Sequence, residues 1–250
     1  MSVAVPIPSF PPSVGLGPRL TRLYQWIGEA QAKGTYHTIW DCCCDHGYLG
    51  IQILKNQLCD QLVFVDQVPH IIEQLQRQLE QQPELYPSER YQAVSGDAGA
   101  LVFDPAVKHL VILAGVGGEH IVDIMRAMAA NAKGKDLDQV AQMDFLLCPT
   151  TTQFDLRQYL NAEHYGLLQE SIVSEKGRDY EVIHVRQPQS GNEYSHALER
   201  VSLTGRMWQS DHEHHQRYHN KLMRHYQRQM RGPKRERAEY IVNHYEQCLA

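Results

Sequence analysis

Three aspartates each stand at the end of a predicted strand, and a glycine-rich segment follows a fourth. Asp41, Asp66 and Asp97 come after apolar strand patterns, and residues 115–118 follow the apolar run at 109–114. Carboxylates at the carboxyl edge of an α/β sheet can accept hydrogen bonds from the hydroxyl and amino groups of a nucleotide-like ligand. Glycines there let a planar ring approach the backbone. A single acid is common at a strand end, but the ordered set predicts a nucleotide-like cofactor at this edge.

The segment of residues 39–50 contains the first of these acids and predicts a strand, a small-residue turn and the start of a helix. A dinucleotide-binding fold would place three glycines in this turn, so that the backbone could reach a pyrophosphate. The acid Asp41 instead suits a cofactor with a cationic end. S-adenosylmethionine has such an end and is therefore the predicted cofactor.

Strands alternate with helices along most of the chain, after a first helix predicted over residues 16–32. Strands are predicted at 37–40, 61–66, 91–97, 109–114 and 143–148, and helices at 49–56, 71–82, 119–131 and 155–163. Two adjacent strands follow at 166–175 and 180–185, around a turn. Continuous apolar strands alternating with helices indicate a parallel sheet covered on both faces. The predicted fold class is α/β: a Rossmann-like methyltransferase fold, mostly parallel, with a terminal antiparallel hairpin.

The last part of the chain has a different composition, rich in Gln, Arg, His, Met and Glu with sparse apolar residues. This pattern is typical of exposed helices, and Gly232 and Pro233 would break them into a helical hairpin with a thin apolar seam. We predict an extended leader (1–15), a methyltransferase domain (16–188), a linker (188–192) and a C-terminal helical, coiled-coil-like domain (194–250).

The net charge of −5 conceals an asymmetry along the chain. Residues 191–250 hold ten Lys/Arg against seven Asp/Glu, a net charge of +3, so residues 1–190 carry −8. A tail of opposite sign favours a polyanion such as nucleic acid as partner, although many charged faces are only solvated. Five cations recur at three- and four-residue steps, which places them on one helical face: Arg217, Lys221, Arg224, Arg228 and Arg231.

Composition excludes several other classes of protein. No segment approaches the ~18–20 apolar residues that span a bilayer, and the proline-rich N-terminus is a poor signal helix. The six cysteines lack a Cys-x-x-Cys spacing, and the tail histidines (212, 214, 215 and 219) lack the acid of a His-Glu-x-x-His motif. We therefore expect a cytoplasmic protein without a membrane contact or a structural metal, whose cysteines are reduced and mostly buried.

Several short motifs carry a resemblance to a known family. They are Arg19-Leu20, Asp41 with Asp45-His46 and Tyr48-Leu49, Ala-Gly-Val-Gly-Gly at 114–118, and Gly177 with Tyr180-Glu181-Val182. With these motifs the chain resembles the bacterial tRNA adenine-N1 methyltransferases that modify adenine 22, the TrmK family, over about residues 16–186. The resemblance implies a Rossmann-like catalytic domain, S-adenosylmethionine as the methyl donor, tRNA as the partner and a helical C-terminal domain that helps to bind it.

The candidate site residues fall into three groups. The predicted cofactor-binding residues are Asp41, Cys43, Gly47, Asp66, Gln67, Asp97, Ala98, Ala114 and Gly115. The predicted catalytic residues are Asp45 and His46. The predicted substrate-binding residues are Gly117, Gly118, Tyr48, Tyr180, Arg217, Lys221, Arg224 and Arg228.

The chain departs from the family's pattern at two places. The glycine of its first-loop pattern Asp-x-Gly-x-Asp-His is Cys43 here, which would be strained if the position requires a positive φ. The family's Gln-Pro-Asn after the fifth strand is Cys148-Pro149-Thr150, so a polar group beside the substrate pocket is lost.

Methylation of adenine N1 is an in-line displacement that depends mainly on alignment and desolvation, because the nitrogen already has a lone pair. Asp45 is the candidate for stabilising the charged product or orienting the base, and His46 for bonding the base or a phosphate, although a histidine in such a turn is often a cap. A flipped base would stack on an aromatic ring. Tyr48 and Tyr180 are the candidates, although both residue types more often serve packing.

Two alternatives remain open from the sequence. The first is a non-catalytic RNA-binding relative in which the changes at Cys43 and at residues 148–150 have removed turnover. The second is a methyltransferase for another RNA site or a small molecule, for which the basic tail would be irrelevant.

Overall fold

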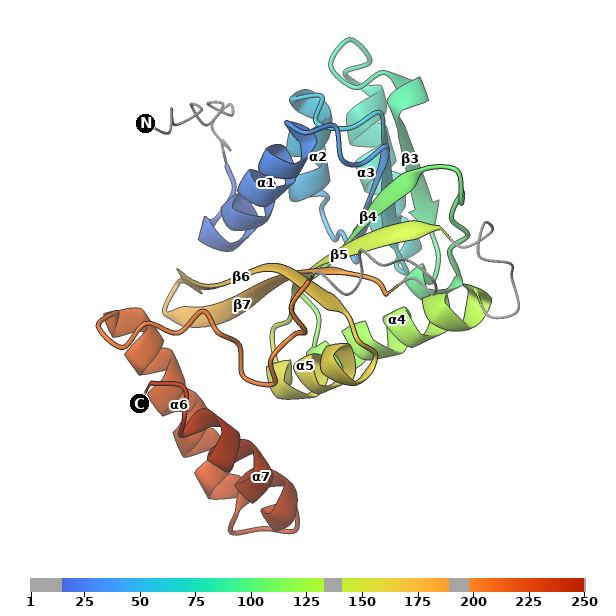
Figure 1. Cartoon of the computed structure of the whole chain (residues 1–250). Helices are drawn as coiled ribbons and strands as arrows, with labels where there is room; N and C mark the ends of the chain where they lie inside the picture. The colour runs from blue at the N-terminus through green and yellow to red at the C-terminus, as the bar shows by residue number, and fades with distance from the viewer. Residues whose placement is uncertain (1–14, 133–140, 189–197, 250) are drawn as a thin grey trace, which may run out of the picture.

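The computed structural model describes residues 15–132, 141–188 and 198–249. Its centre is a seven-stranded sheet in the order β3-β2-β1-β4-β5-β7-β6 (Figure 1). Five strands run parallel: β1 (Thr38–Cys42), β2 (Gln61–Asp66), β3 (Tyr91–Ser95), β4 (Lys108–Ala114) and β5 (Gln142–Cys148). The last two form an antiparallel hairpin against β5: β6 (Gly166–Glu175) and β7 (Arg178–Arg186). The predicted mixed sheet with a terminal hairpin is confirmed.

Helices cover both faces of the sheet (Figure 1). One face carries α1 (Pro18–Gln31), α2 (Tyr48–Lys55) and α3 (Pro69–Glu80). The other carries α4 (Gly118–Ala132) and α5 (Gln153–Ala162). Two short 3-10 turns, η1 (Ser88–Arg90) and η2 (Ala98–Ala100), flank β3.

Strand residues alternate between these two cores because successive side chains point to opposite faces. In β2, Leu62 and Phe64 pack under α1–α3, whereas Val63 and Val65 pack toward α4 and α5. Both faces are therefore apolar, which explains the continuous apolar runs of the sequence and fixes the carboxyl ends of the parallel strands along one edge.

The C-terminal segment forms two helices, α6 (Glu213–Gln229) and α7 (Arg235–Tyr245), separated at Gly232 and Pro233 as predicted. Their shared apolar seam contains Leu222 and Ile241. The seam also includes Phe154 from α5, so the helix pair packs against the body of the protein. The prediction of helix from residue 194 onward is wrong for residues 198–212, which contain no helix. That segment is held to the sheet, since Leu167 N donates to the carbonyl of Glu199.

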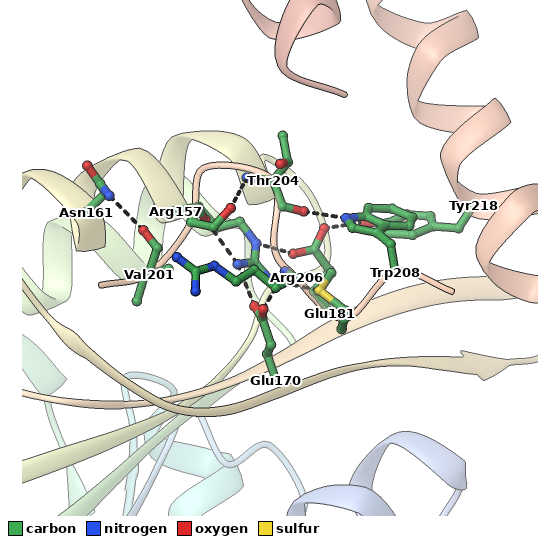
Figure 2. A network of polar contacts seen from close by, with 11 residues as sticks. Arg157, Asn161, Glu170, Glu181, Val201, Thr204, Arg206, Trp208 and Tyr218 are labelled. Carbon is green, nitrogen blue, oxygen red and sulfur yellow. Dashed lines mark hydrogen bonds and ion pairs between the residues drawn. The ribbon is translucent and has the colours of Figure 1, made fainter. Parts of the chain in front are cut away.

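A buried polar network fixes this C-terminal part to the sheet (Figure 2). Arg157 of α5 is fully buried and pairs with Glu181 of β7 and Glu170 of β6. Tyr218 of α6 donates to the other carboxylate oxygen of Glu181 at 3.0 Å. Arg157 also donates to the carbonyl of Ser202. Removing one member would leave a buried charge unpaired, so the network locks three elements in one arrangement.

The leader predicted at 1–15 and the linker predicted at 188–192 fall almost wholly outside the described residues, as does the predicted start of the tail at 194.

Candidate active site at the carboxyl edge of the sheet

Asp41 of β1 is a buried acid, only 5% exposed, next to the first loop. The backbone N–H of Gly50, in α2, donates to its Oδ2 at 3.0 Å. Burial raises the pKa of Asp41 to about 7, against the opposing effect of this hydrogen bond, and nearby Asp66 adds to the rise. No described cation pairs with Asp41. The structure thus holds an acid whose charge has no counterion within the described chain.

Asp66 and Asp97 stand at the next two strand ends. Asp66 accepts from the N–H of Val68 at 3.0 Å and from that of Asp45 at 3.1 Å. Asp97 is exposed and accepts from Gly99 N at 2.8 Å, which caps η2. Neither acid forms an ion pair with a described residue. Both keep acceptor capacity, because a carboxylate has about four lone-pair sites.

The first loop is held in a conformation that favours glycine. Cys43 has φ 56° and Asp45 has φ 50°, both in the left-handed region. The expected strain at Cys43 is therefore present. Burial, followed by the charges of Asp66, Asp41 and Asp97, raises the pKa of the Cys43 thiol to about 11. The three acids thus converge around Cys43, and its thiol is neutral at pH 7.

Two glycines, one at the end of this loop and one in the first turn of α2, are required by packing. A Cβ on Gly47 (φ 66°) would come within 3.1 Å of Leu75 and Phe64, so this residue faces the core. A Cβ on Gly50 would lie 2.2 Å from the ring of Phe64 and 2.9 Å from Asp41 Oδ2. Gly50 therefore lets helix α2 approach Asp41, a role that the sequence analysis missed.

The glycine-rich loop after β4 packs against the loop after β5. Gly115 (φ 92°) donates its N–H to Cys148 O at 3.1 Å, and Gly118 donates to Thr151 O at 2.9 Å. A Cβ on Gly118 would lie 2.5 Å from the carbonyl of Thr152. The backbone N–H groups of Gly115 and Gly118 are therefore already paired within the protein. Ala114, before the loop, is half-buried against the core.

Arg19 of α1 reaches this edge and was absent from the predicted site. Its guanidinium lies 5.1 Å from the ring centroid of Tyr180 and 3.7 Å from Glu175. Its Nε and Nη1 are nevertheless buried without a hydrogen-bond partner. Nη1 lies 3.7 Å from the position of a Cβ on Gly115. The sequence feature that could have revealed Arg19 is its position as a cation on the apolar face of the first predicted helix. Tyr180, stacked under Arg19, is only half-exposed.

Asp45, His46 and Tyr48 form an exposed lip beside the first loop. His46 Nε2 lies 3.7 Å from Asp45 Oδ1, and the rings of His46 and Tyr48 are 5.6 Å apart. Tyr48 is 59% exposed, far more than a packing residue would be. The structure therefore gathers these three predicted residues in one place. Gln67 is also exposed, whereas Ala98, the first residue of η2, is buried.

A model of a methyltransferase domain family matches residues 16–183, more than half of the chain and the whole of the edge just described. The chain belongs to this methyltransferase family. A search of curated protein sequences gave no match.

Solved structures of similar fold cover almost all of this methyltransferase. The B. subtilis m1A22 tRNA methyltransferase TrmK has a TM-score of 0.70 at 18% identity, over 95% of this chain and 100% of that one. M. capricolum TrmK with S-adenosyl-homocysteine has a TM-score of 0.64 at 15% identity, over 94% and 97%. Streptococcus pneumoniae Sp1610 with S-adenosyl-L-methionine has a TM-score of 0.64 at 18% identity, over 93% and 98%. At these identities the likeness shows the fold.

The basic stripe of the methyltransferase's tail is not uniform. Arg217 forms an ion pair with Asp179, a buried acid at the start of β7. This pair joins α6 to the sheet. Lys221, Arg224 and Arg228 are exposed on α6. Arg217 therefore differs from the other cations of the predicted stripe, because its charge is already paired with Asp179.

Neither a membrane-spanning helix nor a metal-binding cluster is found in the described parts of the methyltransferase. None of its described helices is both long and apolar enough to cross a bilayer. Within the same residues no three His, Cys, Asp or Glu side chains are grouped to hold a metal ion. All six cysteines are free thiols.

Proposed function

We propose that this chain is an S-adenosylmethionine-dependent methyltransferase that modifies N1 of an adenine in tRNA. The observation that carries the proposal is the set of three strand-end acids, Asp41, Asp66 and Asp97, which accept only backbone N–H donors within the described chain. Family membership supplies the reaction class. The structural neighbours support tRNA as the substrate, because the B. subtilis protein is an m1A22 tRNA methyltransferase.

The residues present fit the proposed donor on two independent grounds. Asp41 is a buried acid without a counterion and would hold the donor's ammonium group. Arg19, which lies 3.7 Å from Glu175, has two buried nitrogens without a hydrogen-bond partner and would hold the donor's carboxylate. Buried groups of this kind are costly unless a ligand completes them. Asp66 would bond the ribose hydroxyls, and Asp97 with Ala98 would bond the adenine.

The chain's task in the reaction is to align the base and to exclude water. When bound, S-adenosylmethionine supplies an electrophilic methyl group. Adenine N1 attacks through its own lone pair, so no residue has to remove a proton first. Asp45 would orient the base through its exocyclic amino group and stabilise the positive charge of the N1-methylated product. His46 and Tyr48, exposed beside it, would contact the base or a phosphate.

We also propose the domain organisation, with a catalytic domain at 16–188 and a coiled-coil-like helical domain at 194–250 that binds RNA, and a cytoplasmic location. The apolar seam between α6 and α7 supports a helical unit, which Phe154 of α5 joins to the catalytic domain. The exposed cations of α6 support its contact with a polyanion.

The test is calorimetry with S-adenosylmethionine, followed by mass spectrometry of nucleosides from tRNA treated with the protein. We expect donor binding and a gain of 1-methyladenine. Asp45→Ala should preserve donor binding and lower kcat by about 10²–10³-fold, a typical loss for one electrostatic group. Donor binding without methylation of any RNA would favour a small-molecule methyltransferase. RNA binding without donor binding would favour a non-catalytic relative.

A further inference from the structure

A cleft of about 720 Å³ lies between the helices α6 and α7 and the loop that follows β5. Its walls include Lys221 and Arg228 from α6, Lys234 before α7, and Arg178 and Tyr180 from β7. We call it the interhelical cleft. The walls of the cleft are held in a fixed arrangement, because the Arg157 network joins α5, the β6–β7 hairpin and α6 (Figure 2).

The cleft carries a net positive charge. Arg178, Lys221, Arg228 and Lys234 form no ion pair with another described residue. Three acids also line it. Two of them are already paired within the protein: Asp179 with Arg217, and Asp155 with Arg237.

Glu119 is the remaining acid, against four cations whose charge is not matched inside the protein. Free cations that converge in a concave surface attract an anion with several charges. The same cleft contains ring-bearing side chains, among them His225 of α6, which is exposed. Cations mixed with rings are the usual lining of sites for unpaired nucleic acid, since the cations contact phosphates and the bases stack.

The size of the cleft limits its occupant. Sites of about 300–1,000 Å³ hold ligands of drug size, comparable with one or two nucleotides. Double-stranded RNA is instead contacted across a wide, shallow groove and its phosphates, which requires an extended surface. A cleft of this size accommodates an unpaired segment and does not by itself provide the extended surface that a duplex contacts.

The cleft opens next to the methyl-transfer edge. Thr150, Thr151 and Thr152 line it, and Thr151 Oγ1 lies 3.1 Å from the position of a Cβ on Gly117 in the loop after β4. Tyr180 also connects the two places, because it lines the cleft and lies under Arg19 of the site.

We propose that the interhelical cleft binds one or two unpaired nucleotides of the RNA substrate, next to the base that is methylated. This inference rests on the proposed function, because it assumes that the substrate is RNA. Beyond the proposed function, it states which form of RNA the cleft binds. The cleft selects an unpaired segment, and the four cations contact its phosphates.

The test compares three variants that each remove two positive charges. Lys221→Ala/Arg228→Ala empties the cleft of two cations. Arg224→Ala/Arg231→Ala removes two charges of the predicted basic stripe that do not line the cleft. Arg200→Ala/Arg235→Ala removes two exposed tail charges elsewhere. Fluorescence anisotropy at fixed salt measures the binding of a labelled single-stranded RNA pentamer, with a longer, stable RNA duplex as competitor at equal nucleotide concentration.

We expect the cleft variant to lose about ten- to hundredfold in affinity for the pentamer, and the other two less than threefold. The duplex should compete at least tenfold more weakly than an unlabelled pentamer. Equal losses in the cleft and stripe variants, or equal competition by the duplex, would overturn the inference.

Calorimetry with S-adenosylmethionine and tRNA methylation by the wild-type protein distinguish failure of the cleft assignment from failure of the proposed function. If the wild type methylates tRNA while cleft and stripe variants lose affinity equally, only the cleft assignment fails. If the wild type neither binds the donor nor methylates RNA, the proposed function fails and the inference with it. Retained donor binding in the cleft variant, with its affinity for the pentamer lost, supports both.

Discussion

The two ends of the parallel sheet treat a buried aspartate in opposite ways. At the amino end, Asp144 near the start of β5 is 1% exposed and receives two hydrogen bonds from Arg186, each 2.9 Å long. Lys108 lies 3.2 Å from it, and Tyr36 donates to it at 2.7 Å. At the carboxyl end, Asp41 is about as buried but has only the N–H of Gly50.

The electrostatic consequences differ in the same way. Burial alone would raise the pKa of Asp144, but the hydrogen bonds of Arg186 and the charge of Lys108 hold it below its usual range. Burial raises the pKa of Asp41 to about 7, because no cation opposes it. A buried acid that the protein pairs internally serves the fold, whereas one left without a counterion suits a cationic ligand. Partner type therefore separates structural acids from site acids better than burial does.

The largest effect on folding is expected from Asp144→Ala. This change leaves Arg186, Lys108 and the Tyr36 hydroxyl without their shared acceptor, so stability should fall by about 3–5 kcal/mol. Urea denaturation followed by circular dichroism measures it. Asp60→Ala, at an acid with a 75% exposed side chain, is the control and should change stability by less than about 1 kcal/mol. A loss below 1 kcal/mol at Asp144 would mean that the amino-end cluster does not support the fold.

Asp41→Asn should have the opposite profile. Loss of the carboxylate removes the partner of the donor's ammonium group, and one partner of a buried charge pair is worth about 2–5 kcal/mol, so donor affinity should fall at least about thirtyfold. The free protein should be as stable as the wild type at pH 8, or more so. Calorimetry and thermal denaturation measure the two quantities. Unchanged donor affinity would refute the assignment of Asp41.

Donor affinity should also depend on pH through Asp41. The carboxylate form binds the cation, so affinity should rise with pH up to about 7 and fall about tenfold per pH unit below it. The folded pKa lies above the unfolded one, so the stability that Asp41 contributes to the free protein is complete below about pH 4 and is lost as pH rises through 7.

Calorimetric titrations at pH 5.5, 6.5 and 7.5 test this dependence, with Asp41→Asn as the control. The variant's weak binding should be flat across this range. The same slope in both proteins would assign the titration to another group.

Much of the fold could be predicted because periodicity carries it. The strand at Gln61–Asp66 and the strand at Gly166–Glu175 were predicted to the residue, since both are bounded by turn residues. Residues 198–212 could not be, because they pack against elements far away in the sequence. Val201, fully buried in the core, looks in the sequence like one more sparse apolar residue of a helical tail.

The site was predictable where a residue's position in its strand decides its role, and not where long-range pairing does. Asp41, Asp66 and Asp97 follow directly from strand ends. Arg217 looked like the other cations of its helix, but its partner Asp179 lies 38 positions away and only the fold brings them together. Arg19 was named as part of a family motif but not as a site residue, since its buried nitrogens become visible only when Gly115 and Tyr180 surround it.

The smallest effect, and the finest test of the carboxyl end, concerns Cys43. Its φ of 56° costs a side chain about 1 kcal/mol or more. Elsewhere a glycine is less stable than an alanine by about 0.5–1 kcal/mol, because it loses more chain entropy. Both Cys43→Gly and Cys43→Ala remove the sulfur, but only glycine relieves the backbone. We therefore expect the glycine variant to be equal to the alanine variant or up to about 1 kcal/mol more stable in urea denaturation. An alanine variant that is clearly more stable than the glycine variant would show that the first loop is unstrained. Backbone strain would then not be one of the features that distinguish the carboxyl end of the sheet from the amino end.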